Sequence, residues 1–358
     1  MPSVTGVSAG FEVPVVDISS YATGGTAAER ATTAAAMDAA CRTVGFVQVV
    51  GHGVPDGVAA GLASAIDDFF GLPLETKKLL RAPKGVNRGY TPPKSENLSL
   101  SLGVEAASRM NDFFEAFNTG AAVSDYPDAP VPLDPAHYPE DLWPSEELVP
   151  RFRERVQAWE REAGRVARTL TDVFADALGL EPGWFRGSTG HSLDVLRMNN
   201  YALPPGTVDL DGDLTGMGEH TDFGIVTVLW ADQVPGLQVL GADGGWHDVV
   251  PADGALLVNL GDVMARWTNE RWMSTLHRVK PPIVDGTIER RRSAAFFHDG
   301  DVDAVITALP GTVEDGEEPL YPPTTVGEHI AAKLAGSRDL QKNADAAREA
   351  ARVLASTR

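Results

Sequence analysis

The chain has 358 residues, of which 43% are hydrophobic and 22% are charged, as in a globular protein with a buried core. Fifty acidic and thirty basic residues give a net charge of −20, which disfavours binding to nucleic acid or to anionic lipid. The sequence contains no apolar run long enough to span a bilayer, and it does not begin like a secretory signal. Because Cys41 is the single cysteine, we expect a cytoplasmic protein without internal disulfides.

The first part of the chain predicts a mixed α/β region. The segments 14–18 (PVVDI) and 46–50 (FVQVV) have the composition of strands, and helices are expected over 27–44 and 56–70. Residues 84–118 are rich in polar and turn-forming side chains and predict a loop. A plain surface loop and a mobile lid explain this segment equally well.

The rest of the chain predicts one long helix followed by short strands. Apolar residues recur at steps of three and four over 148–180, which indicates an amphipathic helix. Beyond residue 192, short apolar runs and alternating patterns are separated by Gly, Pro and Asp, as in a β-sandwich or jelly-roll barrel. A final helix is expected over 330–354. The fold class is therefore mainly β with flanking helices.

The first candidate for chemistry is the pair His220 and Asp222 in GEHTDFGIVTVLW. Residues two apart on a strand point to the same face, so an imidazole nitrogen and a carboxylate oxygen can reach one ion. A His-x-Asp pair is common by chance and needs a third ligand. His247, His277 and His298 all lie on strand-like segments and are the candidates.

Two histidines with one carboxylate form a facial triad that leaves three metal positions open, which suits Fe(II) that binds oxygen and a co-substrate together. Zinc more often has a closed shell or a single open position. Arg291 and Ser293 in RRRSAAFF share one strand face, where a guanidinium and a hydroxyl can hold a buried carboxylate. Arg290 and Arg292 face the other way and are expected at the solvated surface.

Taken together, these motifs resemble the isopenicillin N synthase-like family of Fe(II)- and 2-oxoglutarate-dependent dioxygenases. The similarity covers nearly the whole chain. It includes VPVVDIS, AACRTVGFVQVVGHGVP and FFGLPLETKK in the N-terminal part, and it continues in GEHTDFGIVTVLWADQVPGLQV, LVNLGDVMARWTN, STLHRVKPP and RRSAAFF. The resemblance implies a distorted double-stranded β-helix (jelly-roll) core behind a mixed α/β N-terminal region.

The resemblance also implies roles for particular residues. The iron ligands fall on His220, Asp222 and His277. The pair that binds the distal carboxylate of 2-oxoglutarate falls on Arg291 and Ser293. The residues of RMNNYALPP that match the family's Asn-x-Tyr are Asn199, near the metal-bound end of 2-oxoglutarate, and Tyr201, which donates its phenol to the distal carboxylate.

The implied domains are an N-terminal non-haem dioxygenase region (1–125), a connection with a support helix (126–190), the jelly-roll core (191–310) and a C-terminal extension (311–358). Substrate contacts are expected from the 84–118 segment. The candidates there are Arg88, Tyr90 and Phe113. Asn259 and Asp262 are expected to shape a turn, and His298 is placed at the barrel rim or near the co-substrate pocket.

The implied activity is hydroxylation of a small-molecule metabolite, with Fe(II), 2-oxoglutarate and O2 as cofactors and succinate and CO2 as products. The alternatives are an iron oxidase or cyclase that does not use 2-oxoglutarate, and a desaturase with the same oxidant. A non-catalytic sensor is disfavoured because all three ligands are present, and a zinc or nickel cupin because Arg291 and Ser293 would then have no role. The sequence names neither the substrate nor the oligomeric state.

Overall fold

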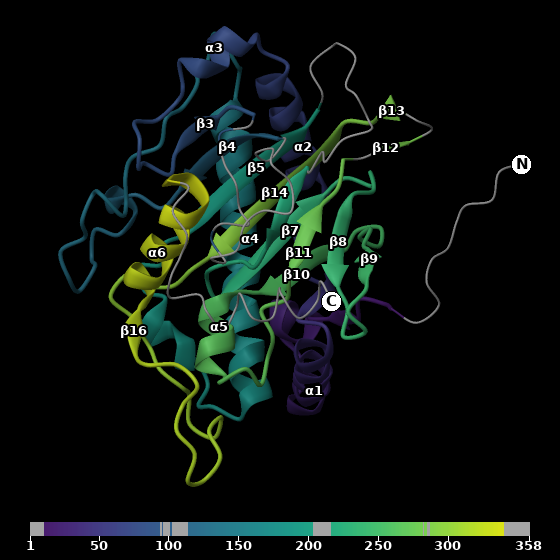
Figure 1. The fold of residues 1–358 in the computed structure, drawn as a ribbon, viewed down its shortest axis with the longest axis vertical. Helices are drawn as coiled ribbons and strands as arrows, with labels where there is room; N and C mark the ends of the chain where they lie inside the picture. Colours follow the sequence, from purple (N-terminus) through teal and green to yellow (C-terminus); the bar gives the residue numbers. More distant parts are fainter. Residues whose placement is uncertain are drawn as a thin grey trace, which may run out of the picture.

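The computed structural model describes residues 11–93, 95, 101, 114–202, 216–281, 283–284 and 287–339 (Figure 1). Its largest element is an eight-stranded sheet with the strand order β1-β2-β10-β7-β14-β5-β4-β3. β1 and β2 pair in parallel, and all the other neighbours in this sheet pair antiparallel. The strands are β1 (Val15–Asp17), β2 (Phe46–Val50), β3 (Gly89–Thr91), β4 (Glu115–Gly120), β5 (Val195–Tyr201), β7 (Val226–Ala231), β10 (Leu256–Leu260) and β14 (Arg291–His298).

A four-stranded sheet with the order β6-β11-β8-β9 faces the large sheet. It consists of β6 (Met217–His220), β8 (Leu237–Leu240), β9 (Trp246–Asp248) and β11 (His277–Val279). Apolar side chains of both sheets form one buried cluster between them, with Phe46 and Leu257 from the large sheet and Leu237 and Val279 from the small one. Two facing, mostly antiparallel sheets are the arrangement expected of the predicted jelly-roll core.

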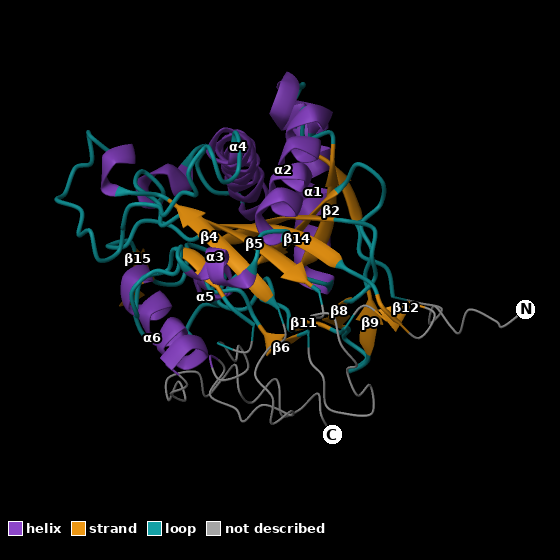
Figure 2. Cartoon of the chain, turned by 90° about the horizontal axis from the view of Figure 1, so that it is seen from above, coloured by secondary structure: helices purple, strands orange, loops and turns teal. Residues whose placement is uncertain are grey.

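Helices cover the other face of the large sheet (Figure 2). They are α1 (Ala27–Thr43), α2 (Asp56–Phe70) and α4 (Phe152–Leu178). The predicted apolar stripe of α4 is buried against the sheet, with Trp159, Val166 and Leu170 fully enclosed. This helix begins later than predicted because Arg151 has a left-handed backbone (φ 56°), and it ends at Gly179, which is also left-handed (φ 69°).

The segment predicted as a loop over 84–118 contains β3 and β4 at its two ends. β4 pairs with β5 along its whole length, so its strand conformation depends on a partner far away in sequence. The residues next to β4 in sequence carry no signal of such a partner. Residues 94, 96–100 and 102–113 lie outside the described residues, and the question of a lid falls there.

The remaining elements are short, apart from the helix α6, which lies beside the sheet edge in Figure 1. This helix begins at Val326, earlier than predicted, and its described part ends at Asp339. The others are α3 (Leu74–Lys78), α5 (Asp262–Trp267), β12 (Ile283–Val284), β13 (Thr287–Ile288), β15 (Val305–Ile306), β16 (Thr324–Thr325) and the single turns Ser20–Gly24, Val123–Asp125 and Trp184–Ser188. Within the described part of the chain, no helix combines the length and apolarity needed to cross a membrane.

Candidate active site

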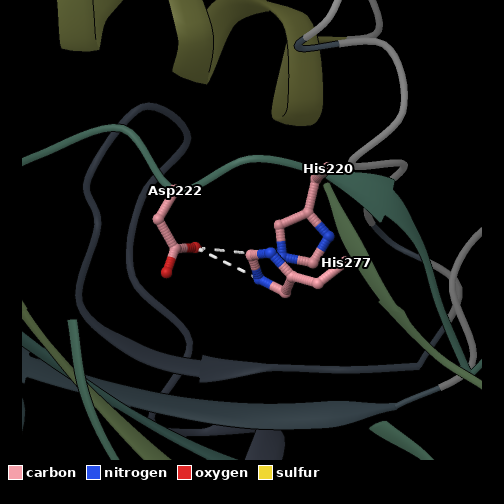
Figure 3. Close-up of side chains that lie close together, drawn as sticks. All are labelled: His220, Asp222 and His277. Carbon is pink, nitrogen blue, oxygen red and sulfur yellow. Dashed lines mark ion pairs between the residues drawn. The ribbon is translucent and has the colours of Figure 1, made fainter. Parts of the chain in front are cut away.

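Three side chains able to bind a metal ion meet at one end of the small sheet (Figure 3). His220 ends β6, Asp222 lies in the following turn, and His277 begins β11. The two strands pair antiparallel with His277 directly opposite His220, so the predicted fold-back brings these two histidines together. Asp222 Oδ1 lies 4.0 Å from His220 Nε2 and 3.6 Å from His277 Nε2. All three side chains are buried.

Backbone carbonyls hold both imidazoles in the tautomer that a metal ligand requires. His220 Nδ1 lies 2.7 Å from the Gly218 carbonyl oxygen, and His277 Nδ1 lies 3.0 Å from that of Thr275. A carbonyl oxygen only accepts, so each Nδ1 carries the proton and each Nε2 keeps its lone pair. Burial lowers the pKa of His220 well below its usual value, and a protonated His277 would lower it further, so the His220 imidazole is neutral at pH 7.

The carboxylate of Asp222 is oriented in a similar way. Its Oδ2 accepts hydrogen bonds from Thr227 Oγ1 at 2.5 Å and from Asn259 Nδ2 at 2.7 Å. Thr227 on β7 and Asn259 on β10 are cross-strand partners in the large sheet. Because Oδ2 is occupied by two donors, Oδ1 is the oxygen that faces the two imidazoles. The prediction that Asn259 shapes a turn is therefore wrong, since it lies on a central strand and orients a ligand.

The other candidate histidines lie elsewhere. His247 is on β9, where Nε2 is 2.9 Å from Asp243 Oδ1. His298 is buried at the end of β14, where Nδ1 is 2.7 Å from Asp194 Oδ1. Neither belongs to the cluster of three, which contains His277, the histidine that the family resemblance implies as the third ligand.

A second cluster, formed by His191, Asp301 and Asp303, has a structural role. Asp301 accepts hydrogen bonds from the backbone N–H groups of Gly190 and His191, and His191 Nε2 lies 2.8 Å from Asp303 Oδ1. These contacts connect the turn before β5 with the turn after β14. Both carboxylate oxygens of Asp301 accept hydrogen bonds from the backbone, which is a structural use of this side chain.

A cavity opens beside the three candidate ligands, and its empty volume with the mouth included is about 1030 Å³. Its floor is made by β5 and β14, whose alternate side chains point into it. The pairing of the two strands places these residues in rows across the floor. The rows are Tyr201 and Arg291, Asn199 and Ser293, Arg197 and Ala295, and Val195 and Phe297.

Arg291 is a buried cation at one end of this floor. Its side chain is 2% exposed, and neither Nε nor Nη1 has a hydrogen-bond partner among the described residues. Its guanidinium lies 5.2 Å from the centre of the Tyr201 ring. Donors left unsatisfied in a buried position are costly, and a carboxylate that accepts two parallel N–H bonds removes that cost. A buried guanidinium with unsatisfied N–H donors beside a cavity is therefore suited to bind a small carboxylic acid.

The other residues predicted for the co-substrate lie in the same two rows. Ser293 is 2% exposed, and Asn199 is opposite to it. Asn199 Oδ1 accepts a hydrogen bond from Arg197 Nε at 3.2 Å. The Tyr201 hydroxyl lies 3.9 Å from Met217 Sδ, across the gap between the sheets. All the residues predicted for metal and co-substrate therefore line one cavity.

The residues predicted for substrate lie farther out. Arg88 and Tyr90 line an outer cavity that shares several wall residues with the inner one. Arg88 Nε forms an ion pair with Asp141 at 3.0 Å, and the Tyr90 hydroxyl donates to Glu115 at 2.6 Å. Phe113 lies outside the described residues.

Several residues of the cavity wall were not predicted from the sequence, including Thr227, Arg197, Asn118 and Asp299. For Arg197 a signal was present, because it occupies the same strand face as Asn199 and Tyr201. For Thr227 and Asp299 there was none, since their place follows from pairing between strands distant in sequence.

Two family models match the chain. Residues 13–146 match the N-terminal region of the non-haem dioxygenases described for morphine synthesis, and residues 193–300 match the 2OG-Fe(II) oxygenase superfamily. Validamycin A dioxygenase from Streptomyces hygroscopicus subsp. limoneus is 33% identical over 90% of this chain and 85% of its own length. The 2-oxoglutarate-Fe(II) type oxidoreductase hxnY from Emericella nidulans is 33% identical, with 88% of each chain covered.

A solved structure extends the similarity to three dimensions. A full-length protein from Neurospora crassa, crystallised with alpha-KG and thymine, superposes with a TM-score of 0.77 at 25% identity. The superposition covers 90% of this chain and 96% of that protein. The similarity therefore includes both the N-terminal region and the jelly-roll core.

Proposed function

Because the chain belongs to the 2OG-Fe(II) oxygenase superfamily and is a 2-oxoglutarate-dependent dioxygenase, we propose that it hydroxylates a small-molecule metabolite. Iron and 2-oxoglutarate supply the oxidation, in which O2 is consumed, 2-oxoglutarate leaves as succinate and CO2, and the substrate gains a hydroxyl group. One relative is named for validamycin A, and the structural neighbour was crystallised with thymine. Both are small molecules, which supports a small metabolite as the substrate class.

We assign the iron to His220, Asp222 and His277. The observation that carries this assignment is the preset direction of the three ligand atoms: two Nε2 lone pairs and one carboxylate oxygen, all within 4.8 Å of one another. Each opposite atom is already engaged by a backbone carbonyl or by a side chain of the large sheet. A triad of two imidazoles and one carboxylate is the donor set that suits Fe(II) with open positions.

We assign 2-oxoglutarate to the floor rows nearest Arg291. The Arg291 guanidinium and the Ser293 hydroxyl would hold the distal carboxylate, with help from Tyr201, and Asn199 would lie toward the iron. Arg290 and Arg292 do not compete for it. Arg290 Nη1 and Arg292 Nη1 both bind Asp67, at 2.7 and 2.8 Å, on the other face of the sheet.

The protein's own contribution is to orient the reactants and to exclude water. Apolar side chains around the cavity, including Phe223, Phe297, Ile330 and Leu334, reduce the access of water to the reacting centre. Arg291 on the large sheet and the two histidines on the small sheet would hold the two ends of the co-substrate. Arg88 and Tyr90 border the outer cavity, and their contact with substrate stays a prediction.

The test is an anaerobic titration of the Fe(II)-loaded protein with 2-oxoglutarate, monitored by the visible metal-to-ligand charge-transfer band of bidentate chelation. We expect the band in the wild type. In Arg291→Ala we expect the half-saturating concentration to rise by an amount equivalent to about 2–5 kcal/mol, because a charge loses its buried partner. Arg290→Ala removes an arginine from the other face and is the matched control.

If iron binds and no band appears, the protein does not use 2-oxoglutarate in this site, and an iron oxidase or cyclase becomes the better hypothesis. An unchanged titration midpoint in Arg291→Ala would contradict the assignment of the distal carboxylate. Product analysis by mass spectrometry then distinguishes a hydroxylase, which adds one oxygen atom to the substrate, from a desaturase, which removes two hydrogen atoms.

A further inference from the structure

Asp299 is a buried carboxylate that the proposed iron and 2-oxoglutarate sites do not use. It directly follows β14 and lines both the inner and the outer cavity. The residue is only 9% exposed. Among the described residues, no hydrogen bond or ion pair engages its side chain, although each acidic residue of the candidate iron site and of the brace at Asp301 is engaged. The described part of the chain supplies no partner for this carboxylate, so a bound ligand could be its partner.

The position of Asp299 relative to the iron site follows from the strand geometry. Arg291, Ser293, Ala295, Phe297 and Asp299 line the cavity at every second position, and eight residues of strand span about 26 Å. Arg291 and Asp299 therefore mark opposite ends of the floor.

The candidate iron ligands lie toward the Asp299 end. Thr227, which holds Asp222, is the cross-strand partner of Phe297, two residues before Asp299. A Cβ atom on Gly224, two residues after Asp222, would overlap Asp299 Oδ1, so the backbone of this turn passes directly beside the carboxylate. Asp299 thus lies next to the iron site, on the side away from Arg291, where a substrate approaching from the outer cavity arrives.

The surroundings of Asp299 favour a cation over a neutral polar group. Phe223 and Phe297 line the same cavity, and the faces of aromatic rings attract cations. Burial raises the pKa of Asp299 well above its usual value, and the negative charge of Asp194 adds to this effect. A protonated amine supplies both a hydrogen bond and a compensating positive charge to a buried carboxylate, whereas an alcohol supplies only the hydrogen bond.

We propose that Asp299 is a specificity-determining residue that pairs with a protonated amine of the substrate. The inference rests on the proposed function, because it takes the inner cavity as the place of oxidation. The substrate class is thereby narrowed to small metabolites with a primary or secondary amine. The amine binds at the Asp299 end of the floor, and the neighbouring part of the substrate lies over the iron ligands.

The test compares amines with alcohols of the same carbon skeleton. Cyclohexylamine and cyclohexanol, benzylamine and benzyl alcohol, and phenethylamine and phenethyl alcohol are titrated by calorimetry into the protein loaded with Mn(II) and 2-oxoglutarate, which does not turn over. We expect the wild type to bind amines at least tenfold more tightly than the matched alcohols. In Asp299→Asn, which keeps the shape and removes the charge, we expect the preference to disappear.

Asp303→Asn is the matched control, because this carboxylate lies four residues farther along the chain and is 52% exposed. It should keep the preference for amines. Asp299→Ala serves as the second variant if the asparagine variant does not fold. The proposal is overturned if the alcohols bind as tightly as the amines, if no amine binds, or if the preference survives in the Asp299 variants. A charge-transfer band with 2-oxoglutarate that persists beside any of these results leaves the proposed function intact.

Discussion

At the scale of single residues, the candidate iron site depends on partners that are not ligands. In each of the three side chains, one polar atom is held by a hydrogen bond, and the other is directed at the two remaining side chains. In Asp222 the held atom is Oδ2, which accepts hydrogen bonds from Thr227 and Asn259. Outer partners of this kind fix the orientation and basicity of ligands and contribute substantially to metal affinity. The large sheet thereby controls a site whose histidines belong to the small sheet.

We expect Thr227→Val and Asn259→Ala each to weaken metal binding roughly 10- to 100-fold, because Asp222 loses a donor and can rotate. Thr227→Ser keeps the hydroxyl and should restore the affinity. Competition for Mn(II) with a chromophoric chelator measures the effect. Equal affinities in Thr227→Val and Thr227→Ser would show that the hydroxyl does not orient the ligand.

At the scale of elements, α6 is attached to the metal-binding turn by a buried ion pair. Lys333 is fully buried, and its Nζ lies 2.7 Å from Asp262 Oδ2 at the start of α5. The same oxygen accepts a hydrogen bond from Thr221, the residue between His220 and Asp222. Burial would raise the pKa of Asp262, but Lys333 and His329 outweigh it and lower the value to about 2. Asp262 therefore does more than shape the turn that the sequence predicts.

We expect Lys333→Met to destabilise the protein by about 3–5 kcal/mol, because the variant leaves Asp262 charged, buried and without its cation. Combining it with Asp262→Leu should recover part of that loss. Lys78→Met breaks the exposed pair with Glu75 and should cost less than about 1 kcal/mol. Urea unfolding measures all three. A loss in Lys333→Met no larger than in Lys78→Met would contradict the role of the buried pair.

The contact between α4 and β4 contains a partly buried acid, Glu160. Glu160 accepts a hydrogen bond from Thr119 Oγ1 at 2.6 Å, and burial raises the pKa of its carboxyl to about 8. The unfolded chain releases this proton near pH 4.5, whereas the native protein keeps it up to about pH 8. The native state therefore binds the extra proton in this window, and stability falls as the pH rises through it.

We expect Glu160→Gln to remove this part of the pH dependence and to be more stable than the wild type by about 2 kcal/mol or more at pH 8. The two proteins should differ little at pH 4.5. Glu162→Gln, two residues along the same helix and paired with Arg165, is the control. Urea unfolding at both pH values measures the effect, and an equal stability difference at the two values would show that Glu160 does not hold the proton.

At the scale of the whole molecule, the proposed ligands join the two sheets. The histidine ligands belong to β6 and β11 of the small sheet, while Arg291 belongs to β14 of the large sheet. A metal ion with chelated 2-oxoglutarate would connect them, so binding and folding are linked.

We expect Mn(II) and 2-oxoglutarate, each at 100 times its dissociation constant, to raise the unfolding free energy by about 2.7 kcal/mol per ligand. Chelation of the metal by EDTA should reverse both increments. His277→Ala should lose both, whereas Arg291→Ala should lose chiefly the second. Thermal unfolding followed by circular dichroism measures them. Stabilisation by 2-oxoglutarate without metal would contradict the proposed chelation.

Much of the fold was predictable because its signals are local. The helices α1, α2 and α4 and the strands β1 and β2 follow from periodicity and from glycine and proline punctuation. β4 was not predictable, because the segment from 84 to 118 acquires strand structure only by pairing with β5. The division into four regions and the cytoplasmic location stay predictions.

The sequence by itself determined the family, the fold class and the candidate residues for iron and 2-oxoglutarate, since these are encoded in short motifs with fixed spacing. The family resemblance implied His277 as the third ligand, and the tertiary structure supplies the reason: strand register places His277 opposite His220, while His247 and His298 lie elsewhere. Only the tertiary structure decided that Asn259 orients Asp222 and that Asp299 lines the cavity beside the candidate iron ligands. The physical reason is that hydrogen bonds and cavity walls form between strands distant in sequence, where no local pattern records the contact.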